Sequence, residues 1–116
     1  MRFSENICVR YQYAVDILSK RWTFLIVRVL HDRPLRFSEL AEQLEVVSDR
    51  VLSERLKELE AEQIVVRRVY PEIPVRVEYS LTDKGRDLGP LFQAIEDWSH
   101  RWVELETALA AASNDH

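Results

Sequence analysis

Four polar side chains share one face of a predicted helix in the segment VSDRVLSERLKELEA, where Arg50, Ser53, Glu54 and Lys57 stand at i, i+3, i+4 and i+7. They offer a guanidinium, a hydroxyl, a carboxylate and an ammonium group. Such groups can bond base edges or phosphate, since arginine binds guanine through two hydrogen bonds and lysine binds phosphate as a point charge. A solvated helix also carries surface pairs such as Arg50–Glu54 and Glu54–Lys57. The spacing alone leaves both interpretations open.

The opposite side of the same segment predicts the helix that positions these groups. Leu52, Leu56 and Leu59 recur there at helical spacing, which is typical of a face buried in a core. Ser48 is a suitable N-cap, and the helix is expected to end near Glu62.

Further helices are expected before and after it. An amphipathic helix near the N-terminus has Ile7, Tyr11, Ala14 and Leu18 on one face. The segment 22–30 is apolar nearly all round, which predicts a central helix, with Ser19 as its N-cap. Ser38 is expected to cap a short third helix. After Thr82, one last helix is predicted, with a 3.5-residue repeat of apolar residues at positions Leu91, Ile95, Trp98, Trp102, Leu105 and Leu109.

The hydrophobic period changes from 3.6 to 2 after residue 63. Residues 75–81 alternate apolar and polar side chains, and the β-branched run IVVRRVY at 64–70 is its expected partner strand. The segment PEIP at 71–74 must be a loop, because its prolines cannot continue a strand. The two strands therefore predict a β-hairpin, and three arginines, Arg67, Arg68 and Arg76, are expected to cluster around its tip.

Composition limits the possible classes of protein. The chain of 116 residues corresponds to one domain, and its net charge of −4 gives no bulk electrostatic argument for nucleic acid. Thirteen of the 16 basic residues are arginine, since lysine occurs only at 20, 57 and 84, and arginine suits planar contacts with phosphate and bases. No signal peptide or membrane span is recognisable, and the one cysteine cannot form an intrachain disulfide, so a cytoplasmic location without membrane contact is expected.

Other chemistry is not predicted. His31, His100 and His116 are scattered, without cysteines or carboxylates at ligand spacing, so no metal site and no cofactor are expected. No glycine-rich phosphate loop or nucleophile–base pattern occurs, so the chain is not expected to be an enzyme. The tryptophans Trp22, Trp98 and Trp102 are interpreted as core and interface residues, with a ligand cage as the alternative.

The order of elements then favours DNA binding. Two helices joined by a short turn and followed directly by a hairpin is the order of a winged helix-turn-helix, in which the second helix enters the major groove and the hairpin reaches the backbone or minor groove. The expected fold class is mainly α with a small β-hairpin. The competing hypothesis is a winged-helix module that binds proteins and not specific DNA, which the net acidity and the glutamates at 54, 58, 60 and 62 support.

Several segments of the sequence also resemble a known family. The segments AVDILSKRWTFLIVRVL, RPLRFSELAEQL, VLSERLKELE and YPEIPVRVEYSLTDKGR resemble the HxlR-type winged helix-turn-helix transcriptional regulators of the MarR-like superfamily. The resemblance covers residues 8–106, taken as one DNA-binding domain that includes dimerisation helices, while 107–116 would be a helix end and frayed tail. It implies a homodimer on an inverted-repeat operator, acting as a repressor or activator; we expect a repressor.

The resemblance and the spacing together define the expected sites. The predicted DNA-binding residues lie at two helix starts, on the polar helix face and in the wing: Ser38, Ser48, Asp49, Arg50, Val51, Ser53, Glu54, Lys57, Arg67 and Arg76. The predicted dimer interface is formed by the apolar faces of the terminal helices: Ile7, Tyr11, Leu91, Ile95, Trp98, Trp102 and Leu105. An apolar surface of this extent is rarely left bare on a monomer.

Cys8 matches the cysteine with which the domain of this family begins, although many members follow it with proline and this chain has Val9. In some members that cysteine senses oxidants, quinones or other electrophiles. A thiol at the start of a helix near Arg10 would be shifted toward thiolate, whereas Glu5 and apolar neighbours oppose the shift. The alternative is an inert cysteine buried in a dimer interface.

Overall fold

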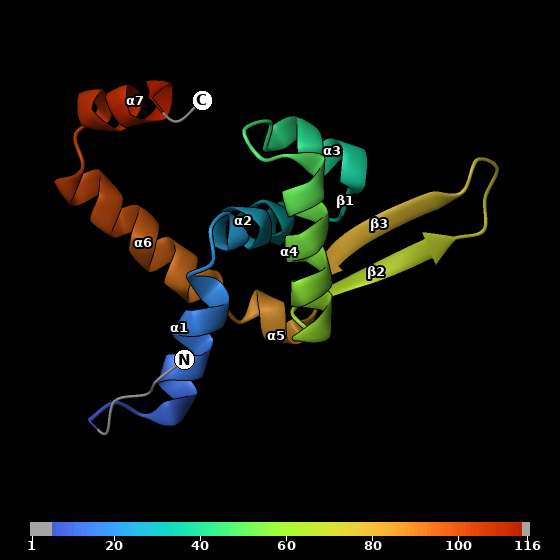
Figure 1. Cartoon of the computed structure of the whole chain (residues 1–116), viewed down its shortest axis with the longest axis horizontal. Helices are drawn as coiled ribbons and strands as arrows, with labels where there is room; N and C mark the ends of the chain where they lie inside the picture. Colours follow the sequence, from blue (N-terminus) through green and yellow to red (C-terminus); the bar gives the residue numbers. More distant parts are fainter. Residues whose placement is uncertain (1–5, 115–116) are drawn as a thin grey trace.

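The computed structural model describes residues 6–114, which form a mainly helical chain with a small antiparallel sheet (Figure 1). The elements follow in the order α1 (Val9–Leu18), α2 (Thr23–Asp32), β1 (Leu35–Arg36), α3 (Phe37–Gln43), α4 (Asp49–Ala61), β2 (Val65–Tyr70), β3 (Arg76–Leu81), α5 (Asp83–Arg86), α6 (Gly89–Trp102) and α7 (Leu105–Ser113). This confirms the predicted fold class. No helix within the described part of the chain is long and apolar enough to cross a membrane.

The core lies where α2, α3 and α4 meet the sheet. Ile26 and Val27 of α2 are fully buried, as the all-round apolar sequence of this helix predicted. Leu52, Leu56 and Leu59 place the inner face of α4 in the same cluster, and the first residue of β2 and the last of β3 close it from the sheet. The hydrophobic face of α4 thus fixes which of its sides points outward.

The sheet has the strand order β1-β3-β2. β2 and β3 pair in the predicted hairpin, with Val65 opposite Leu81 and Tyr70 opposite Arg76. β1 was not predicted: Leu35 and Arg36 pair with Tyr79 and Glu78. Two residues are too short to show a period of two, so only the tertiary pairing reveals this strand.

One of the three predicted N-caps is confirmed. The Ser48 hydroxyl accepts a hydrogen bond of 3.2 Å from the Val51 backbone N–H at the start of α4. Ser19 does not cap α2; it ends α1, where its N–H donates to the Val15 carbonyl, and Trp22 is the N-cap of α2. Ser38 lies one residue inside α3, because Arg36 is the N-cap and its backbone N–H donates to the Glu39 carboxylate at 2.8 Å.

The prediction of one long C-terminal helix is wrong. α5 ends before the Gly89-Pro90 pair, and α6 begins there because proline is tolerated in the first turn of a helix. Val103 and Glu104 are extended, so α7 starts anew at Leu105. No glycine or proline marks this second break. Leu105 and Leu109 therefore leave the continuous 3.5-residue repeat. Of the segment 107–116 that was expected to be a helix end and frayed tail, the part up to Ser113 is helical in α7, and residues 115–116 lie outside the described residues.

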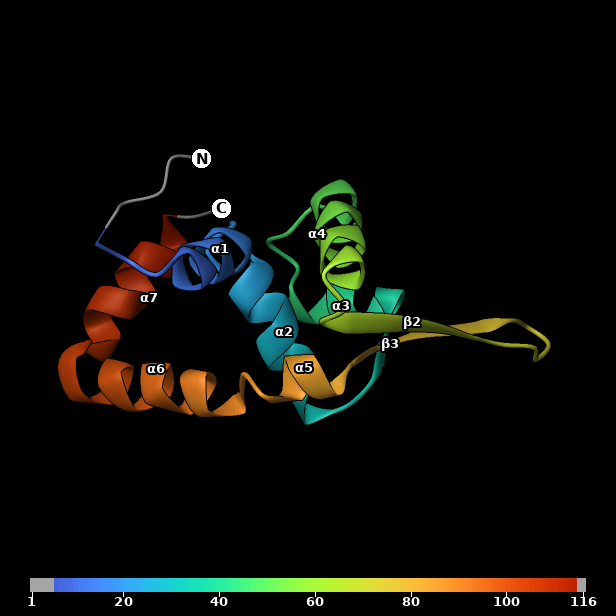
Figure 2. The same ribbon diagram turned by 90° about the horizontal axis from the view of Figure 1, so that it is seen from below.

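One end of the molecule consists of helices and the other of the β-hairpin. Turned by 90°, the molecule shows α1, α6 and α7 at one end and the β2–β3 hairpin projecting from the other, with α3 and α4 between them (Figure 2). The longest dimension is 50 Å. We call α1, α6 and α7 the arm helices, and α2–α5 with the sheet the core half.

Candidate nucleic-acid interface

The outward face of α4 presents the polar groups that the spacing predicted. The Arg50 side chain is 82% exposed and lies 3.4 Å from the Glu54 carboxylate, one helical turn away. Lys57 is exposed on the turn after Glu54, and Ser53, between Arg50 and Lys57 on this face, is half-buried. At this distance and exposure the Arg50–Glu54 ion pair is weak, so the guanidinium can exchange Glu54 for another acceptor at little cost.

The start of α4 is also accessible. Asp49 and Ser48 are exposed, and the Ser48 oxygen is already used as the cap. Val51 is half-buried and packs against the core, so only part of its side chain can face a ligand. Ser38 is exposed near the start of α3.

The register of the hairpin separates the wing arginines. Arg67 is opposite Tyr79 and Arg68 is opposite Glu78, so these neighbouring side chains point to different faces of the hairpin. Both are exposed, and within residues 6–114 neither has an ion-pair partner. Because successive residues of a strand face opposite sides, Arg67 lies on one face of the hairpin, while Arg68 and Arg76 share the other. The expectation that the three arginines form one cluster is therefore wrong for Arg67.

Arg76 is held inside the wing itself. Its guanidinium donates to Glu72 at 3.0 Å and to Glu78 at 2.8 Å, and it stacks over the Tyr70 ring at 4.0 Å. The hydrogen bonds to Glu72 and then to Glu78 raise the pKa of Arg76 above its usual range. Only 27% of the side chain is exposed and two carboxylates compensate its charge, so Arg76 offers less uncompensated charge to DNA than Arg67 or Arg68.

Two wing residues have a more prominent place than the sequence suggested. Arg68 was not among the predicted DNA-binding residues. Its side chain is exposed and could reach a phosphate group. Ile73 is fully exposed at the hairpin tip between two prolines. The sequence could have indicated this exposure, because Ile73 is an apolar residue in a loop bounded by prolines, and a hairpin tip has no core to pack against.

Cys8 lies at the other end of the molecule. It is the N-cap residue of α1 and is exposed. The backbone N–H groups of Tyr11 and then Arg10 lower the pKa of the Cys8 thiol, as hydrogen bonds at a helix N-terminus favour the thiolate. Glu5, expected to oppose this shift, lies outside the described residues.

The arm helices expose most of the apolar residues assigned to a dimer interface. Tyr11 is 65% and Trp102 is 68% exposed, and the remaining members of the predicted set are also exposed: Ile7, Leu91, Ile95, Trp98 and Leu105. An apolar groove of about 370 Å³ runs between α1 and the start of α6, with Tyr11, Leu18 and Leu91 among its walls. Among the described residues no group of three or more metal-ligating side chains is assembled.

Comparison with known proteins places this geometry in a family. A family model described as HxlR-like helix-turn-helix matches residues 17–107. The uncharacterized HTH-type transcriptional regulator YvaP of Bacillus subtilis (strain 168) is 55% identical over 99 residues, covering 85% of this chain and 92% of that protein. The HTH-type transcriptional regulator YodB of the same organism is 45% identical, covering 85% of this chain and 88% of that protein.

Solved structures of YodB share the fold. Its reduced form superposes with a TM-score of 0.77 at 45% identity, covering 84% of this chain and 96% of that chain. YodB has also been solved after treatment with diamide and bound to a quinone. These relatives are transcriptional regulators and not enzymes, and their helix-turn-helix class favours DNA binding over a protein-interaction module. The chain belongs to the HxlR-like helix-turn-helix family and is a DNA-binding transcriptional regulator.

Proposed function

We propose that the protein is a homodimeric repressor in the bacterial cytoplasm that binds an inverted-repeat operator and releases it when Cys8 is oxidised or alkylated. The observation that carries the proposal is the division of the molecule. Exposed polar groups of α4 and the wing lie on the core half, while unpaired apolar surface and the exposed thiol lie on the arm helices.

The DNA-facing surface is proposed to be the first three turns of α4 together with the wing. Arg50 would bind a base edge, Ser53 a base or phosphate, and Lys57 the backbone. In the wing, whichever of Arg67 and Arg68 faces the DNA backbone would bind phosphate ahead of Arg76, because their charges are not compensated within the described residues whereas that of Arg76 is. Repression by occupying the operator needs no element other than these.

The homodimer is supported by the exposed apolar side chains of the arm helices. Trp98 and Trp102 on α6 and Leu105 on α7 form a surface that a second copy could cover. A two-fold interface would present two copies of α4 about 34 Å apart, one turn of DNA, and would therefore require a palindromic site.

The thiol response is supported by the position of Cys8 and by the relatives. The solved structures of YodB include diamide-treated and quinone-bound forms. In a quinone reaction, the Cys8 thiolate would form an S–C bond at a ring carbon, and the ring would become a hydroquinone after proton transfer. With diamide, two thiolates from two chains would lose two electrons and form a disulfide, while the N=N bond gains two electrons and two protons.

The test is DNA binding measured by fluorescence polarisation. DNA fragments selected from a genomic library with purified protein should contain an inverted repeat, and affinity for it should fall steeply as salt rises. Diamide should release DNA from the parent protein and not from Cys8→Ser. Sequence-independent binding would contradict the operator, and an equal diamide response of both proteins would contradict the role of Cys8.

A further inference from the structure

The tip of the wing is an exposed apolar surface at the end of the molecule opposite to the arm helices (Figures 1 and 2). Ile73 has an exposed fraction of 103%, and the valines on the two strands beside it, Val69 and Val75, are 53% and 63% exposed. All residues of the tip, 71–75, are exposed. Apolar groups that are gathered in this way gain free energy when a partner removes them from water, so the tip is suited to a contact.

The tip is also held in one shape. A proline stands on each side of the pair Glu72–Ile73, which restricts the backbone there. The Glu72 backbone N–H donates to the Tyr70 carbonyl at 2.8 Å, and the Glu72 carboxylate accepts from Arg76 at 3.0 Å. The Arg76 guanidinium in turn stacks on the Tyr70 ring. Because these contacts already fix the backbone around Ile73, its side chain loses little conformational entropy on entering a binding site.

The charges of the wing suit a nucleic acid. Glu72 is the acidic residue of the tip, and Arg76 compensates its charge. Arg67 and Arg68 lie on the strand that leads to the tip, are exposed, and have no ion-pair partner among residues 6–114. A DNA groove has phosphates along its rims and stacked bases between them, so free cations beside a neutral apolar tip match its composition.

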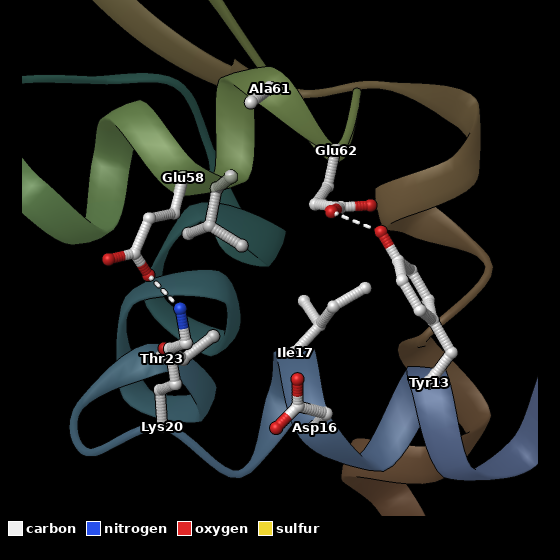
Figure 3. A pocket seen from close by; sticks show the side chains of 9 residues that line it. Tyr13, Asp16, Ile17, Lys20, Thr23, Glu58, Ala61 and Glu62 are labelled. Atoms are coloured by element: carbon white, nitrogen blue, oxygen red, sulfur yellow. Dashed lines mark hydrogen bonds and ion pairs between the residues drawn. The ribbon is translucent and has the colours of Figure 1, made fainter. Parts of the chain in front are cut away.

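The base of the wing is fixed to α4, the helix proposed to enter the major groove. Glu62 directly follows α4, and its carboxylate accepts a hydrogen bond of 2.8 Å from the Tyr13 hydroxyl (Figure 3). The Glu62 carbonyl accepts from Lys84 at 2.6 Å, and the Thr82 hydroxyl, just after β3, donates to the Gln63 carbonyl at 2.6 Å. Both strands of the hairpin are therefore anchored next to α4, so the tip has a fixed position relative to the bases that α4 would contact.

We propose that Ile73 enters the minor groove as an apolar wedge, partly unstacks one base step there and bends the duplex. The inference rests on the proposed function in that α4 and the wing face DNA, and it adds a residue that reads the shape of DNA. The minor groove is about 6 Å wide, too narrow for a helix, whereas a side chain at a hairpin tip fits into it. Isoleucine is among the side chains that open base steps in this groove.

The wedge gives the protein a preference at a base step to which it makes no hydrogen bond. Steps of a pyrimidine followed by a purine, such as TA and CA, unstack at the lowest cost, whereas AA steps are stiff. Ile73 therefore selects sites that have a flexible step where the tip meets the DNA.

The first experiment measures unstacking by the fluorescence of 2-aminopurine, which rises when this base leaves the stack. The duplex is the genomic fragment that the parent protein binds most tightly, whether or not it contains an inverted repeat, and its adenines are replaced one at a time. Parent protein, Ile73→Ala, Ile73→Leu and Val69→Ala are compared, each at a concentration that saturates the duplex, so that differences in affinity do not imitate the result. Val69→Ala is the matched control, because it removes an exposed apolar side chain from the same hairpin below the tip.

In the parent, fluorescence should rise by about threefold or more at one step near each wing, and Val69→Ala should give the same rise. Ile73→Leu should keep the response, since leucine also acts as a wedge, and Ile73→Ala should lose it. No responding position in the parent, or an equal response in Ile73→Ala, would overturn the proposal.

The second experiment measures sequence preference. Exchanging the responding step for AA should lower the affinity of the parent by about fivefold or more, while Ile73→Ala should bind both duplexes alike. An equal loss in the two proteins would overturn the role of Ile73 in sequence preference.

The outcomes also separate this inference from the proposed function. If the tightest fragment lacks an inverted repeat but shows the response that depends on Ile73, the proposed operator fails while the wedge stands. If an inverted repeat is bound and no step responds, the wedge fails while the proposed function stands. Sedimentation velocity of Ile73→Ala without DNA should match that of the parent, and a changed oligomeric state with unchanged fluorescence would assign the tip to a second copy of the chain and overturn the wedge.

Discussion

The core half and the arm helices contain the same kind of sequence pattern but use it differently. In α4, apolar residues at helical spacing are buried by α2 and the sheet of the same chain. In α6, Leu91, Ile95, Trp98 and Trp102 have the same spacing and remain exposed. Only Phe92 joins α6 to the core, with an edge-to-face contact of 6.0 Å to Phe24. Helical periodicity therefore identifies a face to be covered, and it does not identify what covers it.

The core half and the arm helices also differ in their proposed functions, which are DNA binding and dimerisation. The groups proposed to face DNA are placed by intrachain packing, so each chain can present them alone. Within the described residues most apolar side chains of the arm helices remain exposed, and a second copy is proposed to cover them. Variants of the arm helices should therefore lose the dimer, whereas variants of α4 and the wing should lose DNA affinity and remain dimeric.

The largest effect is expected from Trp102→Glu, which puts a charge into the proposed dimer surface. The variant should be monomeric at micromolar concentration and should lose operator affinity by about 100-fold, because each half-site is then bound without the avidity of the other. Sedimentation velocity and fluorescence polarisation measure the two quantities. Ser113→Glu adds the same charge at an exposed position of α7 and should leave both unchanged. A dimer that survives Trp102→Glu would place the interface elsewhere.

Arg50→Ala should have the next largest effect. Operator affinity should fall by about 1–3 kcal/mol, with relaxed preference at one base position per half-site, because a bidentate contact to guanine is lost. Competition with singly substituted operators measures the preference. Arg86→Ala, which removes an exposed arginine of α5 paired with Asp83, is the control. If Arg50→Ala discriminates between operators as the parent does, the DNA-facing side of α4 is misassigned.

Within the wing, Arg67→Ala should flatten the slope of log affinity against log salt by about one unit, as expected for one lost phosphate contact. Arg76→Ala should change this slope less, since Glu72 and Glu78 already compensate its charge. Arg68→Ala, on the other face of the hairpin, shows which face meets the backbone. A larger change for Arg76→Ala than for Arg67→Ala would mean that Arg76 exchanges its carboxylates for phosphate on binding.

The smallest expected effect is on the pH dependence of Cys8 alkylation. Because backbone N–H groups of Tyr11 and Arg10 lower its pKa, alkylation by iodoacetamide should reach its plateau at lower pH in the folded protein than in urea. A depressed pKa means that the unfolded state binds more protons, so this group's contribution to stability is present above the unfolded pKa and is lost as pH falls through the folded pKa. Identical pH profiles in water and in urea would contradict the lowered pKa.

Much of the core half could be predicted from sequence because its signals are local. The leucines of α4, its cap at Ser48 and the proline-bounded hairpin each depend on residues within a few positions of one another. The predictions that failed had weaker local signals. Ser19 and Ser38 are good caps by residue type, but Trp22 and Arg36 occupy the cap positions, and the end of α6 at Val103 has no helix-breaking residue.

The sequence by itself determined the family, the order of the helices and hairpin up to residue 81, and which face of α4 is apolar, because periodicity and sequence motifs are properties of contiguous residues. Only the tertiary structure decided how side chains far apart in sequence meet. It paired β1 with β3, joined Tyr13 to Glu62 across 49 positions, and brought Lys20 to Glu58 across 38. These contacts depend on chain geometry after folding, and no local pattern encodes them.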